Sequence, residues 1–313
     1  KIINNTMSFW SNSKIRNQVA IRMAAAIVVP SIPILAWWRE AKVEREKRTE
    51  EVRTRIRIPN VQTIDDLMIE RCRPGDVLLF DRRWETCATG PFAALSCILA
   101  RIFLCDDDAT KSVEFGKFDH CGLVVPGYHK NVKDKYDPSN LLLLEATAGE
   151  GIVARPLLTR LEMSQSRTVL WLPLHIPGDN RNDPNFEPPP NHRRLLETIE
   201  KYLIEFRDKW ISLSEEQKYV RSHTSLCIVG TIIHALGLAD VTRTPVSPSA
   251  WVVVSALQSA SVAMHVRDRT ALVQRVDDFL RDHRFHQSID ETVRLRPGFK
   301  FLPPVVLREL SRS

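Results

Sequence analysis

The stretch Phe118–Val153 reads FDHCGLVVPGYHKNVKDKYDPSNLLLLEATAGEGIV and contains two short apolar runs. The runs Asp119–Val125 and Leu141–Ala146 have the length of β-strands, and the segment between them is rich in Pro, Gly, Asp, Ser and Asn, which favour turns. This pattern predicts an antiparallel hairpin with a long loop. With the loop centred midway between the runs, His120 lies opposite Glu145 across the two strands.

The pairing of His120 with Glu145 has two interpretations. A carboxylate beside an imidazole can fix the tautomer of the ring and raise its basicity, as in the base of a hydrolase. Alternatively, the histidine is a half-buried residue beside a glutamate at the rim of the sheet. A nucleophile elsewhere in the chain favours the first interpretation.

A cysteine suited to this role lies in the segment SHTSLCIVGTIIHALGL, residues 222–238. Apolar and small residues recur there at helical spacing: Leu226, Val229, Gly230, Ile233 and Leu236. Thr224 or Ser225 is a natural N-cap, and Gly237 is placed to end the helix. Cys227 therefore falls in the first helical turn, where the helix dipole and free N–H groups lower the pKa of a thiol.

Cys227, His120 and Glu145 are together the nucleophile, base and orienting carboxylate of a papain-like cysteine hydrolase. His223, four residues before the cysteine, is a second candidate imidazole. Cys121 points to the opposite strand face from His120 and is expected in the core.

The order of these residues resembles that of the circularly permuted papain-like amidases, which are relatives of bacterial cell-wall cysteine peptidases and of lecithin:retinol acyltransferase. In that family, as here, the histidine and the acidic residue precede the cysteine, which reverses the order in papain. The motifs that carry the resemblance are RPGDVLLF (73–80), DHCGLVV (119–125), LLLLEATAGEGIV (141–153), SLCIVGTIIHALGL (225–238) and PVSPSAW (245–251). The chain differs after Cys227, where Ile228 and Val229 replace the small polar and acidic residues that relatives often carry.

The resemblance implies an α+β, permuted papain-like domain with a small antiparallel sheet. It also implies a catalytic triad of Cys227, His120 and Glu145 acting on an amide or ester bond, without a metal or cofactor. Further strands are expected at Gly151–Pro156 and Thr168–Leu174, and a core helix at Phe92–Leu104.

Three segments are expected along the chain. Residues 1–63 form a membrane anchor and a charged helical stalk, residues 64–254 the papain-like domain, and residues 255–313 a helical extension with an extended tail. An amphipathic helix, capped by Asn191, is inserted in the domain at 191–222. Its apolar face is formed by Leu195, Ile199, Tyr202, Leu203, Phe206 and Trp210.

The N-terminal segment lacks Asp and Glu through Arg39, and Met23–Trp38 is uncharged. A membrane span, a cleaved targeting sequence and a buried core helix are all compatible with it. We favour a span, since the pair Trp37 and Trp38 fits an interfacial aromatic belt, although a bilayer core asks for ~20 residues and two prolines would kink the helix. The acid-poor start resembles a mitochondrial presequence, so the predicted location is a membrane, for instance the inner mitochondrial membrane.

The composition argues against several other classes of function. The net charge of +6 comes from basic residues interleaved with acidic ones, so no nucleic-acid footprint is indicated. The six cysteines include no C-x-x-C pair, which argues against a zinc site and against a disulfide framework. The acidic run Asp106–Asp108 is expected to be a solvated loop, because a calcium site needs more oxygen ligands.

Two functions remain. The first is a membrane-anchored thiol hydrolase or acyltransferase that uses the triad. The second is a non-catalytic accessory subunit of a membrane complex that retains a hydrolase fold. The triad favours the first, whereas the anchor, stalk and tail favour the second, because a stand-alone hydrolase does not need them.

Overall fold

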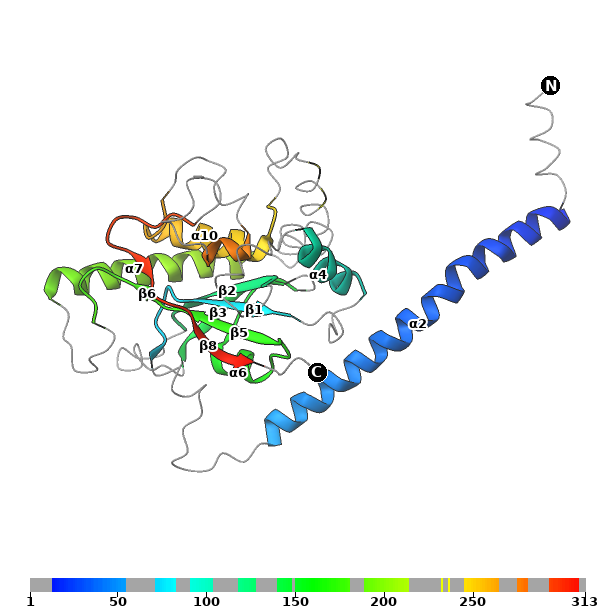
Figure 1. Ribbon diagram of the computed structural model, residues 1–313, viewed down its shortest axis with the longest axis horizontal. Coiled ribbons are helices and arrows are strands. Elements are labelled where there is room, and N and C mark those ends of the chain that lie inside the picture. The colour runs from blue at the N-terminus through cyan, green and yellow to red at the C-terminus, as the bar shows by residue number, and fades with distance from the viewer. Residues whose placement is uncertain are drawn as a thin grey trace, which may run out of the picture.

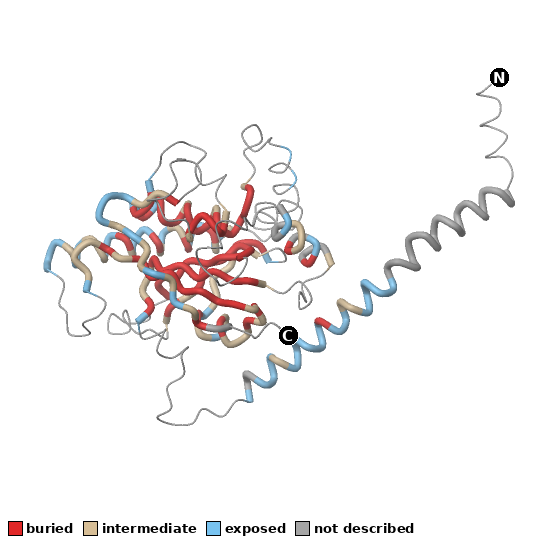
Figure 2. The backbone as a smooth tube through the Cα atoms, viewed as in Figure 1, coloured by how far each residue is buried: buried red, intermediate tan, exposed pale blue. Residues whose placement is uncertain are grey.

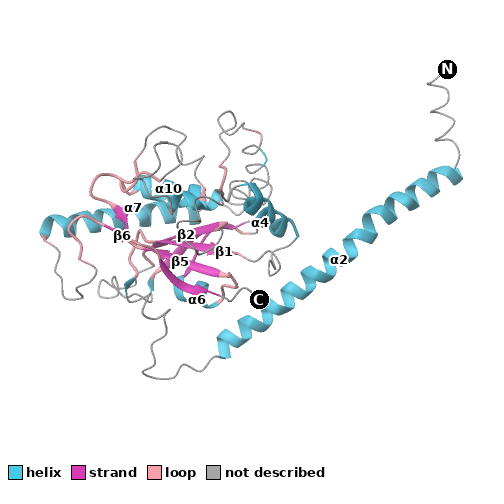
Figure 3. Cartoon of the chain, in the orientation of Figure 1, coloured by secondary structure: helices cyan, strands magenta, loops and turns pink. Residues whose placement is uncertain are grey.

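The computed structural model describes residues 13–54, 71–82, 91–103, 118–127, 140–147, 150–180, 189–213, 232, 236, 245–264, 275–280 and 293–309. Its centre is a six-stranded antiparallel sheet in the order β4-β3-β2-β1-β5-β8 (Figure 1). The strands are β1 (Val77–Asp81), β2 (His120–Val125), β3 (Leu142–Thr147), β4 (Gly151–Pro156), β5 (Thr168–Leu172) and β8 (Val305–Glu309). With its flanking helices, the sheet confirms the predicted α+β class with a small antiparallel sheet (Figure 3).

The predicted hairpin is present as β2 and β3, but its register differs from the prediction. Gly122, not His120, lies opposite Glu145. The register is fixed by packing on both faces of the sheet and not by the midpoint of the loop. Because side chains alternate with period two, this shift of two residues keeps His120 and Glu145 on the same face.

The two ends of the hairpin loop approach each other closely at Gly127. A Cβ atom at this position would lie 1.8 Å from the carbonyl oxygen of Asn140. Only glycine fits there, so this residue allows the chain to leave β2 alongside the start of β3.

One face of the sheet is covered by two helices, α7 (Pro190–Ile211) and α10 (Pro248–Ser259) (Figure 1). Figure 2 shows the sheet beneath them, whose strand β2 is buried along its whole length. On β2 this face receives the odd-numbered residues, Cys121, Leu123 and Val125. The helices contribute buried apolar residues, among them Ile199, Leu203, Trp210, Val253 and Leu257.

The opposite face has a smaller core, covered by the short helix α6 (Leu157–Glu162). Leu157 and Leu161 of this helix pack with buried strand residues that include Leu78, Phe80, Val124 and Leu143. His120 and Glu145 belong to this face, because they alternate with the residues that meet α7 and α10. The candidate site therefore lies on the α6 side of the sheet.

Two of the predicted helices are present. The helix expected in the core at 92–104 is α4 (Pro91–Phe103), in which Ala94 and Cys97 are buried but Leu95 and Ile102 are exposed, so the expectation of a core helix is only partly met. The amphipathic helix α7 begins at Pro190 after an N-cap at Pro189 and ends at Ile211, so the predicted cap at Asn191 and the predicted end at residue 222 are both wrong. Proline suits the first helical turn because its fixed φ matches the helix and its missing N–H is not needed there.

The C-terminal residues belong to the same sheet system. The predicted strand Thr168–Leu174 is divided at Pro173 into β5 and β6 (Leu174–His175), and the tail pairs with both through β8 and β7 (Lys300–Phe301). A short 3-10 helix, Val276–Phe279, precedes the tail. The predicted boundary between the papain-like domain and the C-terminal extension, after residue 254, falls inside helix α10 (Pro248–Ser259). The division into these two segments stays a prediction.

The N-terminal helix α2 spans Ser13–Thr54 and passes through both prolines, Pro30 and Pro33 (Figure 1). Its charged half is mostly exposed, and Arg48 Nη2 donates to the carbonyl oxygen of Glu162 at 3.4 Å. Residues 55–63 of the predicted stalk lie outside the described part of the chain.

Over the residues that the structure describes, no helix is both long enough and apolar enough to cross a bilayer.

Candidate functional site

His120 is the first residue of β2 and is buried. It lies directly opposite Phe80 on β1, and the two ring centroids are 5.7 Å apart. The strand position therefore packs the imidazole against an aromatic side chain on one side and turns it towards β3 on the other.

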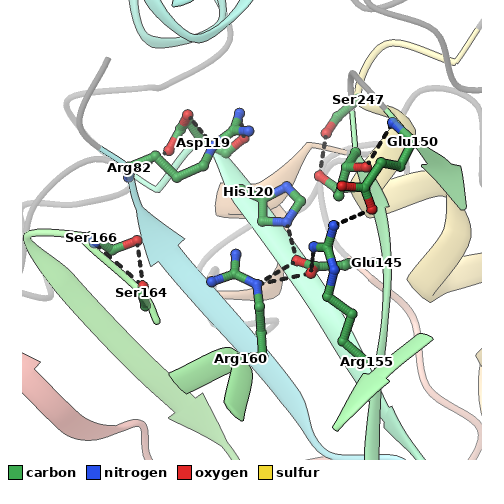
Figure 4. Close-up of polar contacts among 12 residues, drawn as sticks. Arg82, Asp119, His120, Glu145, Glu150, Arg155, Arg160, Ser164, Ser166 and Ser247 are labelled. Carbon is green, nitrogen blue, oxygen red and sulfur yellow. Dashed lines mark hydrogen bonds and ion pairs between the residues drawn. The ribbon is translucent and has the colours of Figure 1, made fainter. Parts of the chain in front are cut away.

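Glu145 of β3 is completely buried and accepts a hydrogen bond from His120, with 2.8 Å between Oε2 and Nε2 (Figure 4). The contact is diagonal across the strand pair, because Gly122 and not His120 lies opposite Glu145. A Cβ atom at Gly122 would lie 2.8 Å from Cγ of Leu143, so the missing side chain makes room for this leucine. The predicted partnership of the two residues is present, and Glu145 is not at the rim of the sheet.

Two arginines complete the surroundings of the carboxylate. Arg155 of β4 donates from Nη1 to Oε1 of Glu145 at 2.7 Å. Arg160 of α6 donates from Nε to Oε1 at 2.8 Å and to Oε2 at 3.1 Å. A buried carboxylate needs such partners, because an isolated charge in the interior is costly. The signal in the sequence is the pair of basic residues in RPLLTR (155–160), directly after the acidic strand.

The charges determine the protonation of the pair. Burial alone would raise the pKa of Glu145, but Arg160 and the hydrogen bond from His120 hold it well below its ordinary value. Burial, together with Arg82, lowers the pKa of His120 despite the opposing effect of Glu145. At neutral pH, a neutral imidazole thus faces an ionised carboxylate. Since that carboxylate only accepts, Nε2 carries the proton and Nδ1 is the basic nitrogen.

A second polar cluster fixes the chain just before His120. Asp119 accepts hydrogen bonds from the backbone N and the Nε of Arg82, both at 2.9 Å. The Cys97 thiol of α4 donates to Asp119 Oδ2 at 3.0 Å. These contacts join the end of β1 and helix α4 to the start of β2, and sequence reasoning did not identify them.

Cys121 lies on the opposite face of β2, as predicted. It is completely buried, and burial raises the pKa of its thiol to about 12. This cysteine is therefore a core residue without nucleophilic character.

Cys227 and His223 lie outside the residues that the structure describes. Of the predicted cysteine helix, Ile232 and Leu236 are described, and the backbone N of Leu236 donates to the carbonyl oxygen of Ile232 at 3.0 Å, as in a helix. A thiol that serves His120 must approach Nδ1 within about 6 Å, close enough for a side-chain rotation to bring it to hydrogen-bond reach. This geometry stays a prediction.

Within the described ranges, no group of three or more His, Cys, Asp or Glu residues is arranged to hold a metal ion. The polar residues of the site instead satisfy one another through the contacts around Glu145. The geometry is suited to acid–base chemistry by an oriented imidazole.

Comparison with known proteins yields no relative: no family model, no curated protein and no solved structure matches this chain. The resemblance to permuted papain-like amidases rests on the five motifs and stays a prediction.

The protonation of His120 predicts how stability depends on pH. Its pKa is lowered from 6.5 in the folded state, so below pH 6.5 the unfolded chain binds a proton that the folded chain does not. We expect the free energy of unfolding to fall with decreasing pH from that point, with His120 contributing up to ~1.4 kcal/mol per pH unit until its folded-state pKa is reached. The depressed pKa of Glu145 acts in the same direction at lower pH, where its contribution is lost.

Urea unfolding between pH 7 and pH 5 measures this slope. The variant His120→Gln lacks the titrating ring and should show a shallower slope than the native chain. The other eight of the nine histidines are common to both proteins and cancel in the comparison. Equal slopes would show that His120 is not held neutral by the fold.

Proposed function

We propose that this chain is a thiol hydrolase or acyltransferase that acts on an amide or ester bond. Cys227 is the nucleophile, His120 the base and Glu145 the residue that orients the base. The observation that carries the proposal is the 2.8 Å contact between His120 Nε2 and a buried, ionised Glu145. A carboxylate that fixes the tautomer of an imidazole in this way is the supporting half of a nucleophile–base–acid triad.

The reaction begins when the Cys227 sulfur attacks the carbonyl carbon of the substrate while His120 Nδ1 accepts the thiol proton. The carbonyl π electrons move to oxygen, and backbone N–H groups at the start of the cysteine helix stabilise that oxyanion. The imidazolium then returns its proton to the leaving amine or alcohol as the carbon–heteroatom bond breaks, which leaves a thioester. Water or an acyl acceptor, deprotonated by the same nitrogen, displaces the thiol.

Two features of the site support this assignment of roles. The imidazole is neutral at rest because burial and Arg82 lower its pKa, so it is able to accept a proton. Glu145 stays ionised throughout because Arg155 and Arg160 share its charge. The permuted papain-like fold belongs to the same proposal.

One observation favours the alternative function, a non-catalytic accessory subunit of a membrane complex. The Glu145 carboxylate is balanced by two guanidinium groups, and His120 is only 3 % exposed. A buried ion cluster of this kind also serves to hold β2, β3, β4 and α6 together without any chemistry. The two functions differ in whether Cys227 is activated.

The experiment that tests the proposal is peptide-resolved labelling of the folded chain with iodoacetamide. We expect Cys227 to react faster than the other five cysteines, and the reaction to depend on His120. If Cys227 labels no faster than Cys72 or Cys87, the accessory-subunit function is supported instead.

Membrane attachment is a further part of the proposal and rests on the uncharged run Met23–Trp38. Three apolar residues on this part of α2 are exposed: Ile32, Ile34 and Leu35. Exposed apolar side chains that lie close together favour contact with an apolar surface, such as the interior of a membrane. We expect the protein to remain in the membrane pellet after high-salt and carbonate extraction. A variant lacking residues 1–39 should enter the supernatant, and full release of the intact chain would contradict attachment by this segment.

A further inference from the structure

Arg160 lies in the site, but neither the proposed triad nor the sequence motifs give it a role. Its Nε lies within hydrogen-bond distance of both carboxylate oxygens of Glu145, whereas Arg155 contacts Oε1 alone. Its guanidinium carbon also lies 4.6 Å from the centroid of the Phe80 ring. Because Phe80 in turn contacts His120, Arg160 touches both groups that surround the imidazole.

The geometry of these contacts restrains the carboxylate. Rotation of the carboxylate about its terminal torsion is soft, since that torsion has a broad energy profile. A donor that contacts both oxygens fixes this rotation, because turning the group weakens at least one of the two contacts. Oε2 is thereby held in the direction of His120 Nε2, as Figure 4 shows.

Arg160 is itself held in place. It lies on α6, which is anchored to the sheet by Leu157 and Leu161, both completely or almost completely buried. Its side chain is 16 % exposed, against 29 % for Arg155, and Arg155 divides its hydrogen bonds between Glu145 and the exposed Glu150. Arg160 is therefore the more rigid of the two partners of Glu145.

We propose that Arg160 is a positioning residue, which orients the Glu145 carboxylate so that His120 is kept in the tautomer with the proton on Nε2 and the lone pair on Nδ1. The assignment rests on the proposed function, because the Nδ1 lone pair is the group that accepts the proton of Cys227. Arg160 does not touch the reacting atoms and acts through Glu145. The depressed pKa values of Glu145 and His120 are consistent with this arrangement.

The test is long-range ¹⁵N–¹H correlation of the imidazole nitrogens in the full chain at pH 7.5, with the His120 signals assigned by their absence in His120→Gln. In the native chain, we expect the spectrum of a ring protonated at Nε2. A native His120 protonated at Nδ1 overturns the proposal, and this measurement requires no variant of Arg160 to fold.

The variant Arg160→Gln removes the donor to both oxygens. We expect the ratio of the Nε2–H to the Nδ1–H tautomer to fall about tenfold, as for the loss of one charge-assisted hydrogen bond. Arg155→Gln, which affects one oxygen of the same carboxylate, should change the ratio less. Arg194→Gln, an exposed arginine of α7, should leave it unchanged. A ratio that is unaffected in Arg160→Gln, or affected equally in Arg155→Gln, overturns the proposal.

Labelling of Cys227 in the same samples separates this proposal from the proposed function. If Arg160→Gln shifts the tautomer and also slows labelling of Cys227 at pH 7, both are supported. If Cys227 is unreactive in the native chain, the hydrolase function fails and the assigned role in catalysis fails with it, whatever the spectra show. If Cys227 is reactive and the tautomer does not respond to Arg160, only the positioning role fails.

Discussion

Replacing Glu145 with leucine is expected to destabilise the folded protein by about 3–5 kcal/mol, because it removes the anionic member of a buried ion cluster. Leucine is similar in size but accepts no hydrogen bond. Arg155, Arg160 and the Nε2–H of His120 would each lose the partner that the structure gives them. Much of the cost comes from these groups, which are left partly buried without their acceptor.

The measurement is the free energy of unfolding in urea, followed by circular dichroism for the native chain and the variant. Glu150→Gln is a matched control, since Glu150 also binds Arg155 but is exposed at the surface. An exposed ion pair of this kind contributes about 0–1 kcal/mol, so the control should differ little from the native chain. A cost for Glu145→Leu no larger than for Glu150→Gln would contradict the view that the cluster stabilises this side of the sheet.

A double variant refines the interpretation. Replacing a complete buried ion pair with apolar side chains is often tolerated, whereas removing one partner is not. We therefore expect Arg160→Met to recover part of the stability lost in Glu145→Leu, although Arg155 keeps only its contact with the exposed Glu150. This recovery identifies the uncompensated guanidinium group as a source of the cost.

The second large effect concerns reactivity, with Cys227→Ser expected to abolish the fast labelling of the chain by iodoacetamide. Cys72, Cys97 and Cys121 are buried, so these three should label slowly. Cys87 and Cys105 lie outside the described residues, and peptide-resolved labelling separates their signals from that of Cys227. In a chain that retains Cys227, His120→Ala should slow its labelling at pH 7 by about a hundredfold, the lower range of general-base contributions. Glu145→Gln should have a smaller effect, because this residue orients the base and does not transfer the proton.

The pH dependence provides the control for this experiment. Above the thiol pKa the sulfur is already deprotonated, so native chain and His120→Ala should label Cys227 at similar rates. A deficit that persists at high pH would indicate restricted access to the thiol, for which the bulky neighbours Ile228 and Val229 are the evident cause. A rate at pH 7 that does not depend on His120 would contradict the triad.

The strand pattern of the hairpin was predictable from sequence because it depends on local periodicity. The positions of β2 and β3 were predicted from apolar runs that are bounded by turn residues. The alternation of side chains along β2 also predicted that Cys121 lies in the core and that His120 lies on the other face. The strand predicted at Gly151–Pro156 is likewise present, as β4. These features follow from the chemistry of neighbouring residues.

The same reasoning placed the register of the hairpin two residues away from the observed one. Turn residues indicate that a loop exists, but the partner of each strand residue depends on packing against β1, β4 and the helices. The diagonal contact between His120 and Glu145 follows from this register, in which Gly122 lies opposite the carboxylate.

By itself, the sequence determined that an imidazole and a carboxylate share one face of a sheet. The tertiary structure alone decided that this face is the one beneath α6, and that Arg155 and Arg160 reach the carboxylate from β4 and α6. It also decided the protonation of the pair, through burial and the guanidinium groups around it. The physical reason is that periodicity is a property of consecutive residues, whereas burial and charge depend on atoms brought together from separate parts of the chain.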